Sequence, residues 1–134
     1  LNIRLKSYDK IVKKRQLNAK YYLKELKTLK DLQLPIQSRE NTYAYHQFVI
    51  RLNKRDLLQN YLKKNGVETM IHYHYMLSEL GIFKDSKGKK TLKNSKRLGK
   101  RILSLPISEE HTKKEIYFVI NLIKNFFEKF EKWN

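Results

Sequence analysis

Residues 66–75 of this 134-residue chain read GVETMIHYHY. Gly66 predicts the end of a helix, because glycine adopts the left-handed backbone angles that follow many helices without strain. The residues after it alternate as in a short strand, and histidines and tyrosines cluster where that strand would end. Binding groups concentrate where a rigid element passes into a loop. We therefore expect this stretch, together with SLPI at residues 104–107, to form a wall of a binding site.

Two further strands are predicted on either side of this stretch. Residues 43–52 alternate between two faces, which is typical of a strand, and residues 102–105 form an apolar run that Pro106 stops. One face of the first of these strands carries Ala44, His46, Phe48, Ile50 and Leu52.

Helices are expected between and outside the strands. Apolar residues three, four or seven apart predict a helix from about residue 3 to 30 and another that begins at the capping box of Thr112 and Glu115. Shorter helices are expected before Gly66 and over residues 94–101. The order predicts an α+β (α/β-like) fold, in which a small three-stranded sheet is covered by helices, with a long N-terminal helix and a C-terminal amphipathic helix.

The composition is that of one globular domain, with 40% apolar residues and nine tyrosines. There is no cysteine, so disulfides and thiolate metal sites are excluded. No apolar run approaches the ~20 residues of a membrane span, and no signal peptide opens the chain, so we expect a cytoplasmic protein without a membrane partner. The chain begins without methionine and inside a helical pattern, which suggests a fragment.

The formal net charge is +17 and the sequence pI is about 10.0. Such a charge is typical of proteins that bind nucleic acid. The lysines, however, are spread along every helix and alternate with apolar positions, as on solvated faces, and the densest group lies between Lys84 and Arg101. A solvated lysine-rich surface and an anionic partner both fit this charge, which alone does not decide between them.

The histidines are candidate metal ligands. His72 and His74 could share a face of a strand, but no carboxylate or cysteine stands beside them as a third ligand, so we predict no metal site. His46 shares the apolar face of residues 43–52 and is predicted to be a hydrogen-bonded core or interface residue, whereas His111 is predicted to be exposed in a loop. Imidazole and phenol groups also hydrogen-bond phosphate or sugar hydroxyls, although a cluster of packed, partly exposed rings explains the same pattern.

Five motifs come in an order that resembles a known family. They are Tyr43-Ala-Tyr-His46-Gln-Phe-Val-Ile-Arg51, Arg55-Asp-Leu57 through Gly66-Val67, Ile71-His72-Tyr73, Leu103-Ser-Leu-Pro106-Ile107, and Thr112-Lys-Lys-Glu115-Ile116. In these motifs the chain resembles the C-terminal small domain of the DegT/DnrJ/StrS sugar aminotransferases, which use pyridoxal phosphate. Lys14-Arg15 and Ala19-Lys-Tyr-Tyr22 resemble the linking helix of that family.

The resemblance implies that residues 1–134 form a single domain, with a linking helix over 1–32 and the small domain over 33–134. The large domain that binds pyridoxal phosphate is absent from this chain and would be its partner. The full-length enzyme would be a homodimeric aminotransferase that transfers an amino group from glutamate to a nucleotide-linked keto-sugar, for cell-surface polysaccharide or amino-sugar biosynthesis. In the family the His-Tyr pair faces the cofactor and substrate cleft, so His72, Tyr73 and His74 are the candidate cleft residues.

The chain departs from the family pattern after this pair. The family commonly continues His-Tyr-Pro-x-Pro-x-His, whereas this chain carries His74, Met76 and Ser78 at the two prolines and the second histidine. The resemblance therefore does not extend to the rigidity of that loop, and whether His74 replaces the second histidine stays open.

No catalytic group is expected in this chain. Pyridoxal chemistry needs a Schiff-base lysine and an acidic partner for the pyridine nitrogen, and in the family both lie in the large domain. We therefore expect the isolated chain to be inert and to bind no pyridoxal phosphate. The alternative is a free-standing basic module that binds nucleic acid or another polyanion through Lys84 to Arg101 and exposed tyrosines. The aminotransferase hypothesis predicts no nucleic-acid partner.

Overall fold

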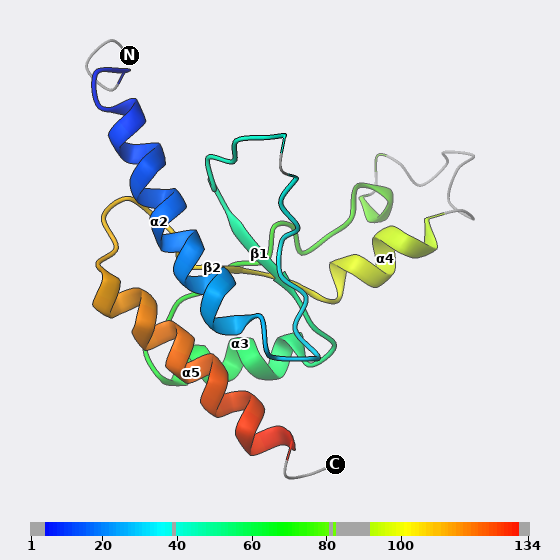
Figure 1. The fold of residues 1–134 in the computed structure, drawn as a ribbon. Coiled ribbons are helices and arrows are strands. Elements are labelled where there is room, and N and C mark those ends of the chain that lie inside the picture. The colour runs from blue at the N-terminus through cyan, green and yellow to red at the C-terminus, as the bar shows by residue number, and fades with distance from the viewer. Residues whose placement is uncertain (1–4, 39, 81, 83–91, 132–134) are drawn as a thin grey trace.

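A computed structural model describes residues 5–38, 40–80, 82 and 92–131 (Figure 1). The elements are α2 (Tyr8–Leu26), β1 (Phe48–Arg51), α3 (Arg55–Lys64), the 3-10 turn η1 (Leu77–Glu79), α4 (Lys93–Gly99), β2 (Ile102–Leu105) and α5 (Lys113–Glu131). The predicted start of the first helix at residue 3 lies outside the described residues, and so do residues 84–91 of the lysine-rich stretch from Lys84 to Arg101.

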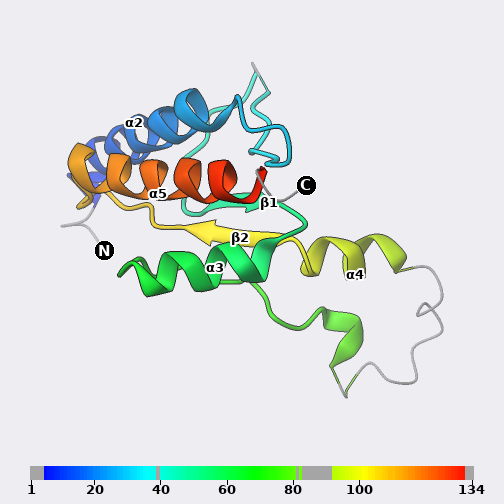
Figure 2. The ribbon, with the colours of Figure 1, turned by 90° about the horizontal axis from the view of Figure 1, so that it is seen from below.

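The elements form a small sheet covered by helices, which confirms the predicted α+β class. Figure 2 shows α2 beside α5 at one end of the arrangement and α3 beside β2 at the other, whereas α4 extends away from these elements. Helix α5 packs against both α2 and α3. The sheet is antiparallel, and its register pairs Phe48 with Leu105 and Arg51 with Ile102.

The prediction of three strands is wrong in its middle strand. Within the described residues the sheet has two strands, and of residues 67–73 only Met70 joins it, through an isolated bridge to Ser104. The neighbouring backbone groups are bonded elsewhere. The Val67 amide donates to the Leu62 carbonyl at the end of α3, and the Thr69 carbonyl accepts a hydrogen bond from the side chain of Gln59. These bonds take the place of a continuous ladder.

The first strand is shorter than the predicted span of 43–52. Phe48, Ile50 and Leu52 are buried as the alternation predicts, but Ala44 and His46 are exposed. Tyr45 lies between them with a φ of 48°, in the left-handed region, so the extended backbone does not reach back to residue 44. Tyr45 itself is buried against Phe48.

Local signals account for two helix boundaries. The α3 helix ends where the Gly66 and Val67 amides donate to the carbonyls of Lys63 and Leu62, with Gly66 at a φ of 78°. The predicted capping box is present at the start of α5. Thr112 donates its amide to the Glu115 carboxylate, and the Glu115 amide donates to the Thr112 hydroxyl.

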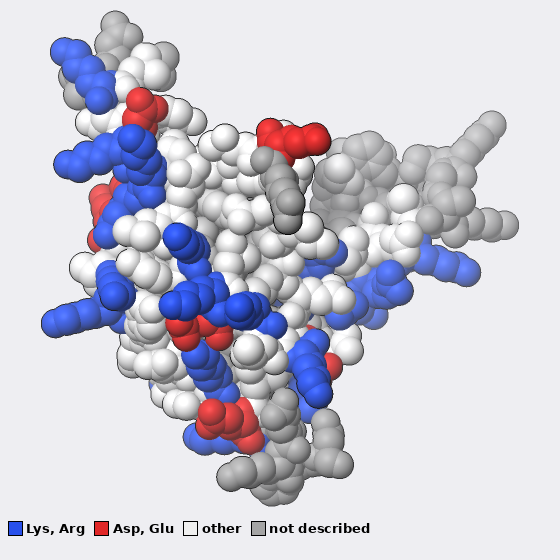
Figure 3. Space-filling view, in the orientation of Figure 1, with Lys and Arg blue, Asp and Glu red and all other residues white. Residues whose placement is uncertain are grey.

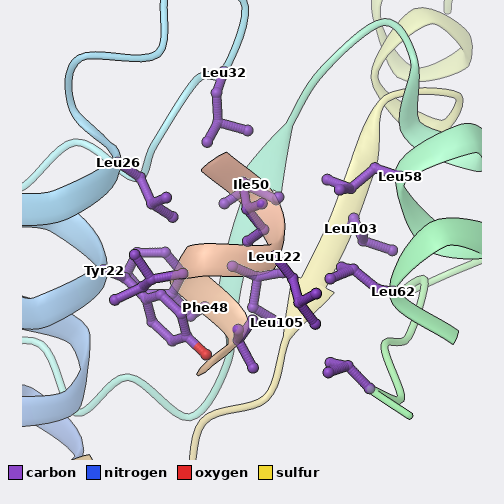
Figure 4. Packing of buried hydrophobic residues seen from close by; sticks show 14 of the residues in the cluster. Tyr22, Leu26, Leu32, Phe48, Ile50, Leu58, Leu62, Leu103, Leu105 and Leu122 are labelled. Atoms are coloured by element: carbon purple, nitrogen blue, oxygen red, sulfur yellow. The ribbon is translucent and has the colours of Figure 1, made fainter. Parts of the chain in front are cut away.

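The core lies where α2, α3 and α5 meet the sheet (Figure 4). Tyr22 of α2 is fully buried, its ring centroid lies 4.9 Å from that of Phe48, and its hydroxyl donates to the Pro106 carbonyl at 2.9 Å. Burial raises the pKa of the Tyr22 hydroxyl above its ordinary value. The helices and strands contribute further buried side chains, among them Leu26, Ile50, Leu58, Leu62, Leu103, Ile116, Ile120, Ile123 and Phe126.

Candidate functional site

The segment that carries the predicted site is fastened to β2 at one point. Met70 and Ser104 exchange two backbone hydrogen bonds, of 3.2 Å from the Met70 amide and 2.7 Å from the Ser104 amide. After this bridge the chain turns at His72 and Tyr73, which are joined by a cis peptide bond. The site therefore starts at a fixed position on the sheet and continues as a turn.

His72 is held by a second contact to β2. Its Nδ1 lies 2.9 Å from the Ser104 hydroxyl oxygen, and its ring is half-buried. The Tyr73 ring packs edge-on against the imidazole, with 5.7 Å between the centroids. Tyr73 and Tyr75 are 72% and 71% exposed, so their hydroxyls are accessible to a ligand.

The three predicted site residues line one pocket of about 810 Å³. One wall comes from residues 71–77 and the other from the side of α4 that faces them. The sequence alternation placed His72 and Tyr73 on opposite faces, but no strand continues past Met70, so both reach the same pocket. The lining residues are Ile71, His72, Tyr73, His74, Tyr75, Met76, Leu77, Leu80, Ser95, Leu98, Gly99 and Ile102.

Gly99 of α4 lies directly against the Met76 side chain. A Cβ atom at Gly99 would lie 2.7 Å from the terminal methyl carbon of Met76, which is too close for two carbon atoms. The sequence prediction missed this wall of the pocket, because its residues Ser95, Leu98 and Gly99 are distant in sequence from residues 71–77 and include no histidine or tyrosine. The signal that could have indicated it is the apolar pair formed by Leu98 of α4 and Ile102 at the start of β2, which both line the pocket.

The chemistry of the lining suits binding rather than covalent catalysis. Imidazole and phenol groups supply hydrogen bonds, and most other lining side chains are apolar. Among the described residues that line the pocket there is neither a lysine nor a carboxylate. The lining therefore does not fit a complete pyridoxal phosphate site, which requires an amine for the Schiff base and an acid at the pyridine nitrogen.

His46 does not belong to this pocket. It is exposed, so the core alternative of the prediction is wrong, because the buried alternation starts only at Phe48; an interface role stays a prediction. It lines a smaller hollow of about 390 Å³ beside the first turns of α2, together with Leu5, Tyr8, Ile11, Val12, Arg15, Ala44 and Glu109. His111 is half-buried rather than exposed, and its backbone carbonyl accepts a hydrogen bond of 3.2 Å from the fully buried Asn18 side chain.

The positive charge does not collect into one patch on the face drawn in Figure 3. Lysine and arginine side chains are spread over this face, with acidic side chains among them. Some are paired, as Lys124 is with Glu25 at 2.8 Å. This distribution favours a solvated surface over a dedicated groove for nucleic acid. Residues 84–91 of the densest lysine group, Lys84 to Arg101, lie outside the described residues.

The described ranges show neither a cluster of potential metal ligands nor a helix that could span a membrane. There, no three side chains of His, Asp or Glu come together as a metal site. The helices of the same ranges are too short or too polar to cross a membrane.

Comparison with known proteins decides the family. The model of the DegT/DnrJ/EryC1/StrS aminotransferase family matches residues 1–124. The chain belongs to this family. The prediction drawn from the five sequence motifs is thereby confirmed at the level of the family.

Curated relatives of this family member include nucleotide-sugar transaminases. The chain is 25% identical over 126 residues to the dTDP-3-amino-3,6-dideoxy-α-D-galactopyranose transaminase of Aneurinibacillus thermoaerophilus, covering 94% of this chain and 34% of that protein. It is 26% identical over 136 residues to the dTDP-3-amino-3,4,6-trideoxy-α-D-glucose transaminase of Streptomyces venezuelae, covering 98% of this chain and 35% of that protein. The chain thus spans about a third of the length of the curated relatives it matches.

Solved aminotransferase structures share the fold. DesV of S. venezuelae, in complex with a ketimine intermediate, superposes with a TM-score of 0.90 at 25% identity, over 95% of this chain and 34% of that one. A family member from Brucella abortus superposes with a TM-score of 0.85 at 26% identity, over the same fractions of the two chains.

Proposed function

We propose that this chain works as the small domain of a pyridoxal-phosphate-dependent aminotransferase that acts on a nucleotide-linked keto-sugar. Residues 1–32 would form the linking helix and residues 33–134 the domain proper. The observation that carries the proposal is the family match over residues 1–124, combined with the names of relatives that transaminate dTDP-linked sugars. Glutamate as amino donor and a place in polysaccharide or amino-sugar biosynthesis belong to the same proposal.

The pocket at His72 would contribute one wall of the substrate cleft. Its imidazole and the exposed Tyr73 and Tyr75 hydroxyls offer hydrogen bonds to oxygen atoms of the sugar or of the diphosphate. The apolar side chains around them exclude water, which strengthens those hydrogen bonds by lowering the local dielectric constant. In this role the chain binds and orients the substrate and makes no covalent bond to it.

The reacting groups would come from a separate large domain. Pyridoxal phosphate, when bound there, supplies the electron sink for amino transfer. Among the described residues, the pocket lining offers neither the lysine nor the acid that this cofactor needs. The chain alone is therefore inert in this proposal, and the working enzyme is a homodimer of two-domain subunits.

The first turns of α2 give a surface for that large domain. Leu5, just before α2, and Tyr8, its first residue, are apolar or aromatic yet 59% and 53% exposed. They line the hollow of about 390 Å³ with half-buried Ile11 and Val12. Exposed apolar patches of this kind mark contacts with other protein surfaces.

Activity assays on two forms of the protein test the proposal. The chain alone, mixed with pyridoxal phosphate and glutamate, should give no internal aldimine absorption band and no amino transfer. The complete gene product with its large domain should convert a dTDP-linked 3-keto-6-deoxy sugar to the amino sugar, detected by mass spectrometry. A saturable, stoichiometric aldimine at one lysine of the 134-residue chain would overturn the assignment of the cofactor to another domain.

A further inference from the structure

Ser104 combines burial with a contact to the candidate site. Its side chain belongs to β2, and the residue is only 7% exposed. Asn18 is the other buried polar residue within the described ranges, and it binds loop carbonyls far from the pocket. A buried hydroxyl requires a hydrogen-bond partner, because an unpaired one costs free energy.

The sheet geometry directs this hydroxyl toward His72. Leu103 and Leu105, which flank Ser104, are buried in the core, so Ser104 points to the opposite face of the strand. The two backbone hydrogen bonds between Ser104 and Met70 fix the distance to the segment that carries His72. The result is the contact of 2.9 Å between the serine oxygen and Nδ1.

The direction of this hydrogen bond follows from the partners within reach. In the described part of the chain, His72 is the sole hydrogen-bond partner of the Ser104 hydroxyl. A serine hydroxyl has one proton to donate, and a buried donor without an acceptor is costly. Donation to Nδ1 satisfies that proton and requires Nδ1 to be unprotonated. The proton of the neutral ring then lies on Nε2.

We propose that Ser104 is a positioning residue that holds His72 in the Nε2–H form, so that the imidazole presents a hydrogen-bond donor to the pocket. Such a donor suits an acceptor oxygen of the ligand, either a phosphate oxygen or a sugar carbonyl. A ring free to exchange tautomers would present a donor and an acceptor in turn. The use of this donor toward a nucleotide-sugar rests on the proposed function, whereas the state of the ring does not.

The nitrogen-15 shifts of the His72 ring test the proposal on the chain itself, without ligand or cofactor. The sample is kept at a pH well above the ~6.5 of a free histidine, so that the ring is neutral. We expect the shift of an unprotonated, hydrogen-bonded nitrogen at Nδ1 and of a protonated nitrogen at Nε2. A protonated Nδ1 in the unsubstituted chain would overturn the proposal at once.

Substitutions at Ser104 separate positioning from packing. Ser104→Ala should move both ring shifts toward those of a free histidine, and Ser104→Thr, which keeps the hydroxyl, should leave them near the original values. Backbone amide shifts of β2 show in each case whether the strand is retained. If Ser104→Ala does not fold, Ser104→Cys replaces it, since a thiol is a much weaker donor. Unchanged ring shifts in a folded Ala or Cys variant, or equal changes in the Thr variant, would contradict the proposal.

Discussion

Arg15 and Glu109 form an ion pair through two nitrogens, since Nε and Nη2 of the arginine each lie 2.8 Å from Oε2 of the glutamate. The third nitrogen, Nη1, donates to the carbonyls of Tyr45, His46 and Ile107 at 3.3–3.4 Å. One side chain of α2 therefore holds both the loop before β1 and the loop after β2. This contact fixes α2 relative to the sheet.

Arg15→Lys should destabilise the chain although it keeps the charge. A lysine ammonium cannot reproduce the planar fork that reaches the carboxylate and the carbonyls together. We expect the free energy of unfolding to fall by roughly 1–3 kcal/mol, the range for hydrogen bonds to charged groups. Chemical denaturation measures it. Lys13→Ala, an exposed site on the same helix, is the control and should stay within about 0.5 kcal/mol. Equal losses in the two variants would contradict this role of Arg15.

The two described glycines with a structural role should respond differently to alanine. Gly66 has a φ of 78° and open space around a would-be Cβ, so Gly66→Ala should cost about 1–2 kcal/mol through backbone strain alone. At Gly99 the new methyl would meet the flexible end of Met76. Gly99→Ala should therefore cost less stability but shift the methyl resonance of Met76. Denaturation midpoints and carbon-13 methyl spectra check both outcomes, and a neutral Gly66→Ala would show that the left-handed turn is unstrained.

The parts of the fold that sequence predicted well are those set by local signals. The structure has β2 at Ile102–Leu105, as the apolar run before Pro106 predicts. It also has the predicted capping box of Thr112 and Glu115 at the start of α5. Each of these signals lies within a few residues of the element that it determines.

The errors concern features that depend on distant partners. Only an isolated bridge forms where a strand was predicted at residues 67–73. The neighbouring backbone amide and carbonyl groups are hydrogen-bonded instead to the end of α3 and to the Gln59 side chain. Of the two predicted positions for His46, core or interface, the core is wrong because Tyr45 turns the backbone before β1. At the site, sequence indicated the histidines and tyrosines, but the wall from α4 and the contact of Ser104 appear only in three dimensions.

The capping box should make stability depend on pH. The Thr112 amide and hydroxyl hydrogen-bond the Glu115 carboxylate and lower its pKa below the ordinary 4.5. A carboxyl whose pKa is lower in the folded state stabilises that state above pH 4.5, and this contribution is lost as the pH falls through the lowered pKa. Glu115→Gln should therefore be less stable at pH 7 and lose less stability on acidification.

Denaturant midpoints at pH 7 and at several values below 4.5 measure this difference. Glu128→Gln, an exposed glutamate of the same helix, is the matched control. If both variants follow the pH dependence of the original chain, the capping box does not contribute to it.

Turnover by the complete enzyme with histidine substitutions tests the proposed substrate cleft most directly. His72→Ala removes the ring that lines the larger pocket, and His46→Ala removes an exposed ring from the smaller hollow. We expect His72→Ala to lower kcat/KM for the keto-sugar roughly tenfold, as the loss of about 1.4 kcal/mol implies. The kcat/KM of His46→Ala should stay within about twofold of the original value. Denaturation curves should show that both variants are folded. Full activity of a folded His72→Ala enzyme, with a loss in His46→Ala alone, would contradict the account.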